Sequence, residues 1–155
     1  MIRGFEQTHL LPAEDQGHLQ WSAALGAGLI AGAILLIVPR GSPWSELTFF
    51  SPAIMGRALA PGYQLSLAAV WFAHLGISIL YGLIISLSIA RLTQARAVFV
   101  GGFVGLILYV LNWAAVGFLA PSMRGNELSV LFTHVVFGLI AAGAYRGLLK
   151  RKKIA

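Results

Sequence analysis

Four long apolar runs dominate the chain, and shorter stretches that contain charged residues or proline separate them. A membrane-spanning helix needs about 20 mainly apolar residues, because each residue advances the helix by about 1.5 Å. The runs are continuous rather than alternating, which favours helices over the strands of a membrane barrel. The pattern therefore predicts an all-α, polytopic membrane four-helix bundle with spans at about 21–38, 63–90, 97–120 and 128–149.

The segments outside the spans differ in character. Residues 1–20 form a polar N-terminal segment without an apolar stretch, so we expect it to remain part of the protein rather than act as a signal peptide. The transmembrane domain covers 21–149, and residues 150–155 form a basic tail. The outer loop at 40–62 contains too many large apolar side chains for open water, which predicts short interfacial helices there.

Composition supports a membrane protein and argues against a nucleic-acid binder. Hydrophobic residues make up 58% of the chain and charged residues only 10%, whereas soluble domains carry about 25% charged residues. The net charge of +6 would fit a nucleic-acid partner only on a soluble fold with a basic face. The chain has no cysteine, so disulfides and thiolate metal sites are excluded.

The basic residues predict the orientation of the chain. Basic loops stay on the cytoplasmic side of a membrane. Three basic residues outside the spans fall on one predicted side, namely Arg40, Arg57 and Arg124. Eight fall on the other side, namely Arg3, Arg91, Arg96, Arg146, Lys150, Arg151, Lys152 and Lys153. The sequence therefore predicts that both termini are cytoplasmic, which an even number of spans allows.

Small residues recur four apart in the first and third spans. Gly28 and Gly32 lie in the first span, and Gly101 and Gly105 lie in the third. Glycine lets helix backbones approach closely in lipid, where van der Waals contact drives helix association. We expect these four glycines, together with Gly138 in the fourth span, to lie at helix contacts.

The second and fourth spans each carry one histidine after a phenylalanine, at His74 and His134. The glycine pairs are 73 residues apart and the histidines 60, and the longer loop at 40–62 accounts for the difference. Two tandem two-helix repeats would produce these offsets, related by an axis along the membrane normal.

Polar side chains inside the spans are the candidate site residues. They are His74, Ser78, Tyr81, Asn112 and His134. Polar groups are costly against lipid, so we expect them to point into the bundle. Three interpretations stay open. The histidines form interhelical hydrogen bonds, or the polar residues form a proton or solute path, or His74 and His134 ligate a haem iron.

From these interpretations we rank three possible functions of the protein. We expect a non-catalytic accessory or assembly subunit of a larger membrane complex, without a cofactor or resident metal, whose partners are lipid and other membrane subunits or its own copies. A small transporter, channel or proton-relay protein is the alternative, and a bis-His haem b electron-transfer subunit is the third. No enzyme is predicted, because all five acidic residues lie outside the spans.

Four short spans with His134 followed by Gly138 resemble uncharacterised bacterial inner-membrane proteins of the YagU-like family. The resemblance implies a bacterial cytoplasmic membrane and makes no statement about a site.

Overall fold

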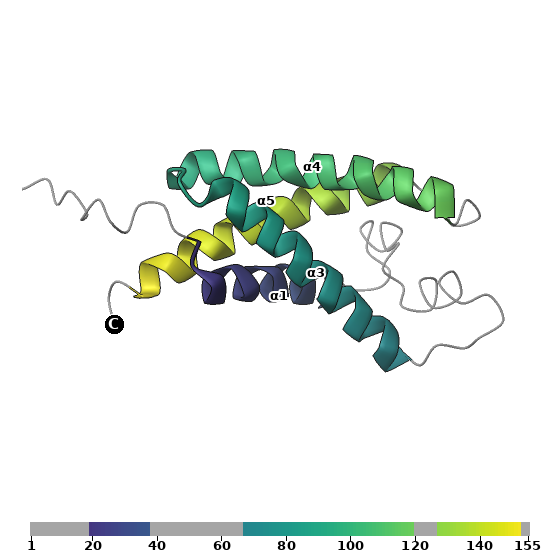
Figure 1. The fold of residues 1–155 in the computed structure, drawn as a ribbon, viewed down its shortest axis with the longest axis horizontal. Helices are drawn as coiled ribbons and strands as arrows, with labels where there is room; N and C mark the ends of the chain where they lie inside the picture. Colours follow the sequence, from purple (N-terminus) through teal and green to yellow (C-terminus); the bar gives the residue numbers. More distant parts are fainter. Residues whose placement is uncertain (1–18, 38–66, 120–126, 153–155) are drawn as a thin grey trace, which may run out of the picture.

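A computed structural model describes residues 19–37, 67–119 and 127–152. It contains four helices in these ranges, α1 Trp21–Ile37, α3 Leu67–Ile89, α4 Gln94–Leu119 and α5 Glu127–Lys152 (Figure 1). No strand occurs in the described ranges, so the all-α prediction is confirmed. The predicted short helices at 40–62, most of the N-terminal segment and the end of the basic tail lie outside the described residues.

Three of the four helices are long and apolar enough to cross a membrane. The qualifying stretches are Trp71–Ile89 in α3, Gln94–Ala115 in α4 and Val130–Lys150 in α5. The described part of α1 has 17 residues, or about 26 Å of helix, and falls at the lower limit of a span. The helix α4 begins three residues before the predicted span, and α5 continues past it through Lys152, because Gln, Lys and Arg are good helix formers.

The turn between α3 and α4 reverses the chain within a few residues. The Leu92 N–H donates to the Ile89 carbonyl over 3.0 Å, which closes the end of α3. The Ala97 N–H then donates to the Thr93 carbonyl over 2.8 Å, which opens α4. The tight turn makes α3 and α4 run in opposite directions, as the predicted topology requires.

The helices form two principal pairs. The helix α1 packs along α3, and α4 packs along α5. The helix α5 also packs against α1, so it lies between α1 and α4 in Figure 1, while α3 runs obliquely across the other helices. The helices α1 and α4 barely touch each other.

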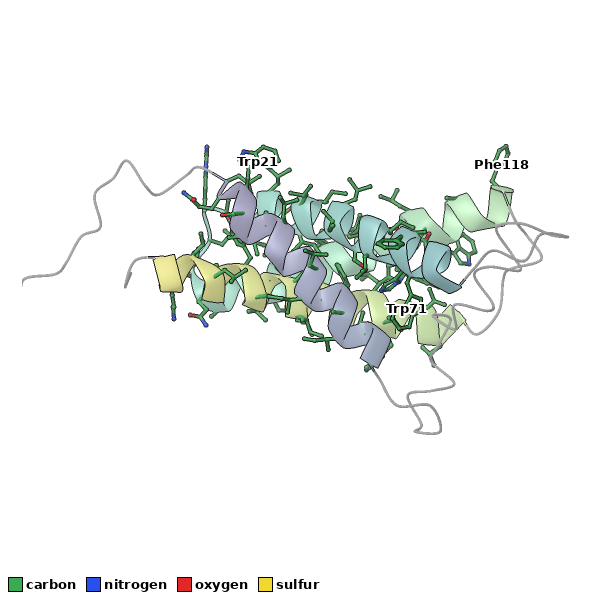
Figure 2. The ribbon with its side chains drawn as sticks, turned by 90° about the horizontal axis from the view of Figure 1, so that it is seen from below. Trp21, Trp71 and Phe118 are labelled. Carbon is green, nitrogen blue, oxygen red and sulfur yellow. The ribbon has the colours of Figure 1, made fainter. Side chains whose placement is uncertain are left out.

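Small side chains fill the interior, and large ones cover the outside. Seven of the buried core residues are alanines, namely Ala23, Ala24, Ala27, Ala31, Ala97, Ala141 and Ala142. Figure 2 shows Trp21 at one end of the molecule and Trp71 and Phe118 toward the other, all on the outside. Phe118 is 87% exposed. Aromatic rings at both ends of apolar helices suit the two interfaces of a bilayer.

Glycines bring α1 and α3 into backbone contact. A Cβ atom added to Gly28 would lie 2.6 Å from the Ser78 carbonyl oxygen and 2.8 Å from the Ile79 Cα. A Cβ atom added to Gly82 would collide with the Gly28 backbone. Added to Gly32, it would lie 2.6 Å from the Ser78 side chain. The helices could not approach this closely with any larger residue at Gly28 or Gly82.

The α4–α5 pair has the same contacts at corresponding positions. A Cβ atom on Gly101 would lie 2.5 Å from the Ala142 Cβ and 2.7 Å from the Gly138 carbonyl oxygen. Added to Gly105, it would meet the His134 carbonyl oxygen. Gly101 and Gly105 thus occupy the places of Gly28 and Gly32. The opposing residues His134, Gly138 and Ala142 correspond to His74, Ser78 and Gly82.

Alanine substitution should separate packed from unpacked glycines by the sign of the stability change. We expect Gly28→Ala and Gly82→Ala each to lower the free energy of unfolding by about 1–3 kcal/mol, because the added methyl overpacks a backbone contact. Gly76 on α3 has no described atom within 4 Å of an added Cβ. Gly76→Ala should therefore be neutral or stabilising by up to about 1 kcal/mol, through helix propensity. Unfolding in mixed micelles, followed by far-ultraviolet circular dichroism, measures all three variants. Equal losses for Gly76→Ala and Gly28→Ala would contradict the packing assignment.

Candidate functional site

Of the five buried polar residues in the described helices, four form two pairs, one on α3 and one on α5. His74 and Ser78 lie one turn apart on α3, and Thr133 and His134 are neighbours on α5. The histidines are only 5% and 7% exposed, respectively. Each lies one turn before the small residue that meets a glycine of the paired helix. The helical repeat therefore places both imidazoles beside a close backbone contact.

His74 forms a hydrogen bond between helices. Its Nε2 donates to the Gly32 carbonyl oxygen over 3.2 Å, joining α3 to α1. A carbonyl only accepts, so the hydrogen of a neutral His74 ring lies on Nε2. Glycine has no side chain to shield its carbonyl, and the packed glycine contact beside it brings the ring within reach.

His134 bonds instead within its own helix. Its Nδ1 donates to the Val130 carbonyl oxygen, four residues earlier on α5, over 2.8 Å. In a neutral ring this places the lone pair on Nε2. Among the described residues, no hydrogen-bond partner faces Nε2 of His134. This nitrogen can accept a proton or a hydrogen bond.

Two tyrosine rings from neighbouring helices pack against His134. The Tyr81 ring on α3 lies 6.0 Å from the imidazole centroid, and the Tyr109 ring on α4 lies 5.9 Å away with an edge-to-face tilt. Phe137 packs edge-on against Tyr81 at 6.3 Å. We call these four residues the His134 cluster. Edge-to-face and tilted ring pairs at this separation are favourable beyond their burial.

The predicted site residues do not form one continuous group. His74 bonds toward α1, whereas His134 lies among rings of α3 and α4. Ser78 lies against Gly32, and Tyr81 belongs to the His134 cluster. Asn112 is half-buried on α4, and no hydrogen bond joins it to either histidine within the described ranges.

Sequence reasoning missed two residues of these contacts. Tyr109 follows Gly105 by four residues and therefore continues the glycine face of α4 onto His134. Gly82 follows Ser78 by four residues and continues the small-residue face of α3 onto Gly28. Helical spacing would have identified both, had it been extended one turn further.

Two further polar groups lie in the core near the start of α1. The Tyr145 hydroxyl accepts a hydrogen bond from the Gln20 N–H over 3.4 Å, which ties the chain before α1 to α5. The Ser86 hydroxyl on α3 is buried without a hydrogen-bond partner among the described residues. The described residues contain no group of three or more histidine, cysteine or acidic residues that could hold a metal ion.

The histidine geometry sets a condition on haem ligation. A haem iron held by imidazole nitrogens of both histidines would occupy one ring nitrogen on each. Nε2 of His74 and Nδ1 of His134 already donate to carbonyl oxygens, so a bis-His site would have to use the remaining nitrogens or break these bonds.

The described residues thus form a helical protein with three helices that are long and apolar enough to span a membrane. Comparisons with models of known protein families, with curated proteins and with solved structures found no match to it.

Haem ligation and hydrogen bonding by the histidines can be distinguished by the absorption spectrum of the protein and by its free energy of unfolding. We expect the purified protein to show no haem absorbance band, because both rings bond to backbone carbonyls. We expect His74→Ala to lower the free energy of unfolding by about 0.6–2 kcal/mol, the contribution of an interhelical hydrogen bond in a membrane. A haem band that is lost in both His74→Ala and His134→Ala would overturn this assignment.

Proposed function

We propose that the chain is a non-catalytic membrane subunit that assembles with or stabilises a larger membrane complex. The support is chemical and geometric. The spans contain no acidic residue, and each buried histidine donates a hydrogen bond to a backbone carbonyl. An interior of this kind serves to hold helices together rather than to carry out a reaction.

The observation that carries the proposal is an unoccupied glycine pair on α5. Gly143 and Gly147 lie four residues apart, and no described atom lies within 4 Å of a Cβ added to either. The glycines at the helix contacts, such as Gly28 and Gly101, are instead covered by a neighbouring helix. Two glycines at this spacing permit the close approach of a helix from another chain. A partner subunit or a second copy of this chain would supply that helix.

The proposed location is the bacterial cytoplasmic membrane, with α1 as a fourth span and both termini in the cytoplasm. The resemblance to YagU-like inner-membrane proteins supports the choice of membrane. The orientation is supported by basic residues at the end of the molecule where α1 and α4 begin and α5 ends, since basic segments remain cytoplasmic.

Bulky substitutions on α5 should separate assembly from folding. We expect Gly143→Leu and Gly147→Leu to abolish copurification of partner chains in mild detergent while leaving the unfolding midpoint nearly unchanged, because no described atom lies within 4 Å of a Cβ added at either position. Gly76→Leu, at an equally open glycine on α3, is the matched control and should keep both properties. Wild-type protein that purifies alone as a monomer under all mild conditions would refute the proposal.

A proton-relay function is the second candidate, and the His134 cluster is the observation that favours it. No described residue bonds to Nε2 of His134, and two tyrosines from two other helices pack against the ring. His74 is less suited to a relay, because its Nε2 hydrogen is committed to Gly32.

The relay function predicts a difference between the two histidines. In vesicles carrying the purified protein and an internal pH dye, His134→Ala should abolish proton flux, whereas His74→Ala should retain it in the fraction that folds. Far-ultraviolet circular dichroism of each variant controls for folding. The subunit function predicts no flux from the wild type, so a flux-free wild type eliminates the relay.

A further inference from the structure

Basic side chains from three segments gather at one end of the molecule. Arg91 lies in the turn after α3, Arg96 in the first turn of α4, and Arg146 and Lys150 in the last turns of α5. Three are exposed, and Arg146 is half-buried. We call these four residues the basic end. The stem of a partly buried arginine can lie along apolar surface while its guanidinium extends toward the membrane interface.

The helix register brings these segments to the same level. Gly101 meets Ala142 across the antiparallel α4–α5 pair, so the start of α4 lies beside the last turns of α5. Leu92 in the turn and Leu149 on α5 pack against the same core. The bond from Gln20 to Tyr145 places the start of α1 there as well. Figure 1 shows the α3–α4 turn, the start of α1 and the end of α5 at one end of the molecule.

No described carboxylate balances this charge. Glu127 is the sole acidic residue in the described ranges, and it begins α5 at the opposite end. Glu6, Glu14 and Asp15 lie outside the described residues. Trp21 is 64% exposed at the start of α1, where an indole ring suits the headgroup region.

We propose that the basic end binds anionic phospholipid headgroups in preference to zwitterionic ones. Each lysine or arginine near an anionic membrane surface is attracted to it, and the attraction falls off within a Debye length. The four cations come from three segments that lie at the same end of the bundle, so their attractions to the headgroups of one leaflet add up. The occupant is a lipid of the phosphatidylglycerol class in the leaflet that faces this end. This binding goes beyond the proposed function, because it needs no partner subunit.

Trp21 provides a reporter for lipid at the basic end. A variant in which Trp44, Trp71 and Trp113 are replaced by phenylalanine keeps Trp21 alone, and a second variant keeps Trp113 alone near the opposite end. Both are reconstituted in vesicles with brominated phosphatidylglycerol or brominated phosphatidylcholine, whose chains quench indole fluorescence on contact. We expect phosphatidylglycerol to be preferred several-fold at Trp21, with the preference reduced in 0.5 M salt, and no preference at Trp113.

Substitutions of basic residues, made in the variant that keeps Trp21 alone, test whether the charge of the basic end causes the lipid preference. The combined Arg91→Gln, Arg96→Gln, Arg146→Gln and Lys150→Gln variant should lose the preference. The combined Arg91→Lys, Arg96→Lys and Arg146→Lys variant should keep it, because the charge remains. Arg40→Gln, Arg57→Gln and Arg124→Gln together form a control for net charge and should also keep it. Equal quenching of wild-type Trp21 by both lipids would overturn the proposal. A preference for phosphatidylglycerol that survives in the combined Arg91→Gln, Arg96→Gln, Arg146→Gln and Lys150→Gln variant, with native helix content, would also overturn it.

Discussion

Close approach of helix backbones at glycine is the contact on which the rest of this structure depends. Lipid chains are as apolar as leucine, so burying large side chains does little to hold membrane helices together. Contact area between backbones must do so instead. Gly28 against Gly82 provides it for α1 and α3, and Gly101 against Gly138 provides it for α4 and α5. The alanine-rich core continues these contacts along the helices.

The buried hydrogen bonds follow from that approach. His74 reaches the Gly32 carbonyl because the glycine contact beside it brings α3 close to α1. An unpaired polar group in hydrocarbon costs several kcal/mol, so the imidazoles are accommodated only where carbonyls are accessible. The Ser86 hydroxyl is the exception in the described interior, since it is buried without a partner there.

The two helix pairs share their contacts but use their histidines differently. His74 donates to Gly32 of the paired helix α1. The Tyr109 ring packs on His134, and that histidine donates to its own helix. The matching glycine contacts of the two pairs agree with the predicted tandem repeat, and in the described helices two tyrosine rings pack against His134.

The sequence by itself determined the helices, their approximate ends and the small residues able to lie at contacts. Hydropathy and length are properties of each segment alone, so four apolar runs were sufficient to predict four helices, and spacing by four placed Gly28 and Gly32 on one face. Only the tertiary structure decided that α1 pairs with α3 and that His74 and His134 bond to different carbonyls. It also decided that no described helix covers Gly143 and Gly147. Those outcomes depend on how helices rotate and cross, and many rotations bury a similar apolar area. Small steric differences distinguish among these rotations; a Cβ atom at position 82, for example, would collide with the Gly28 backbone. The sequence near Gly82 does not show which helix that atom would meet.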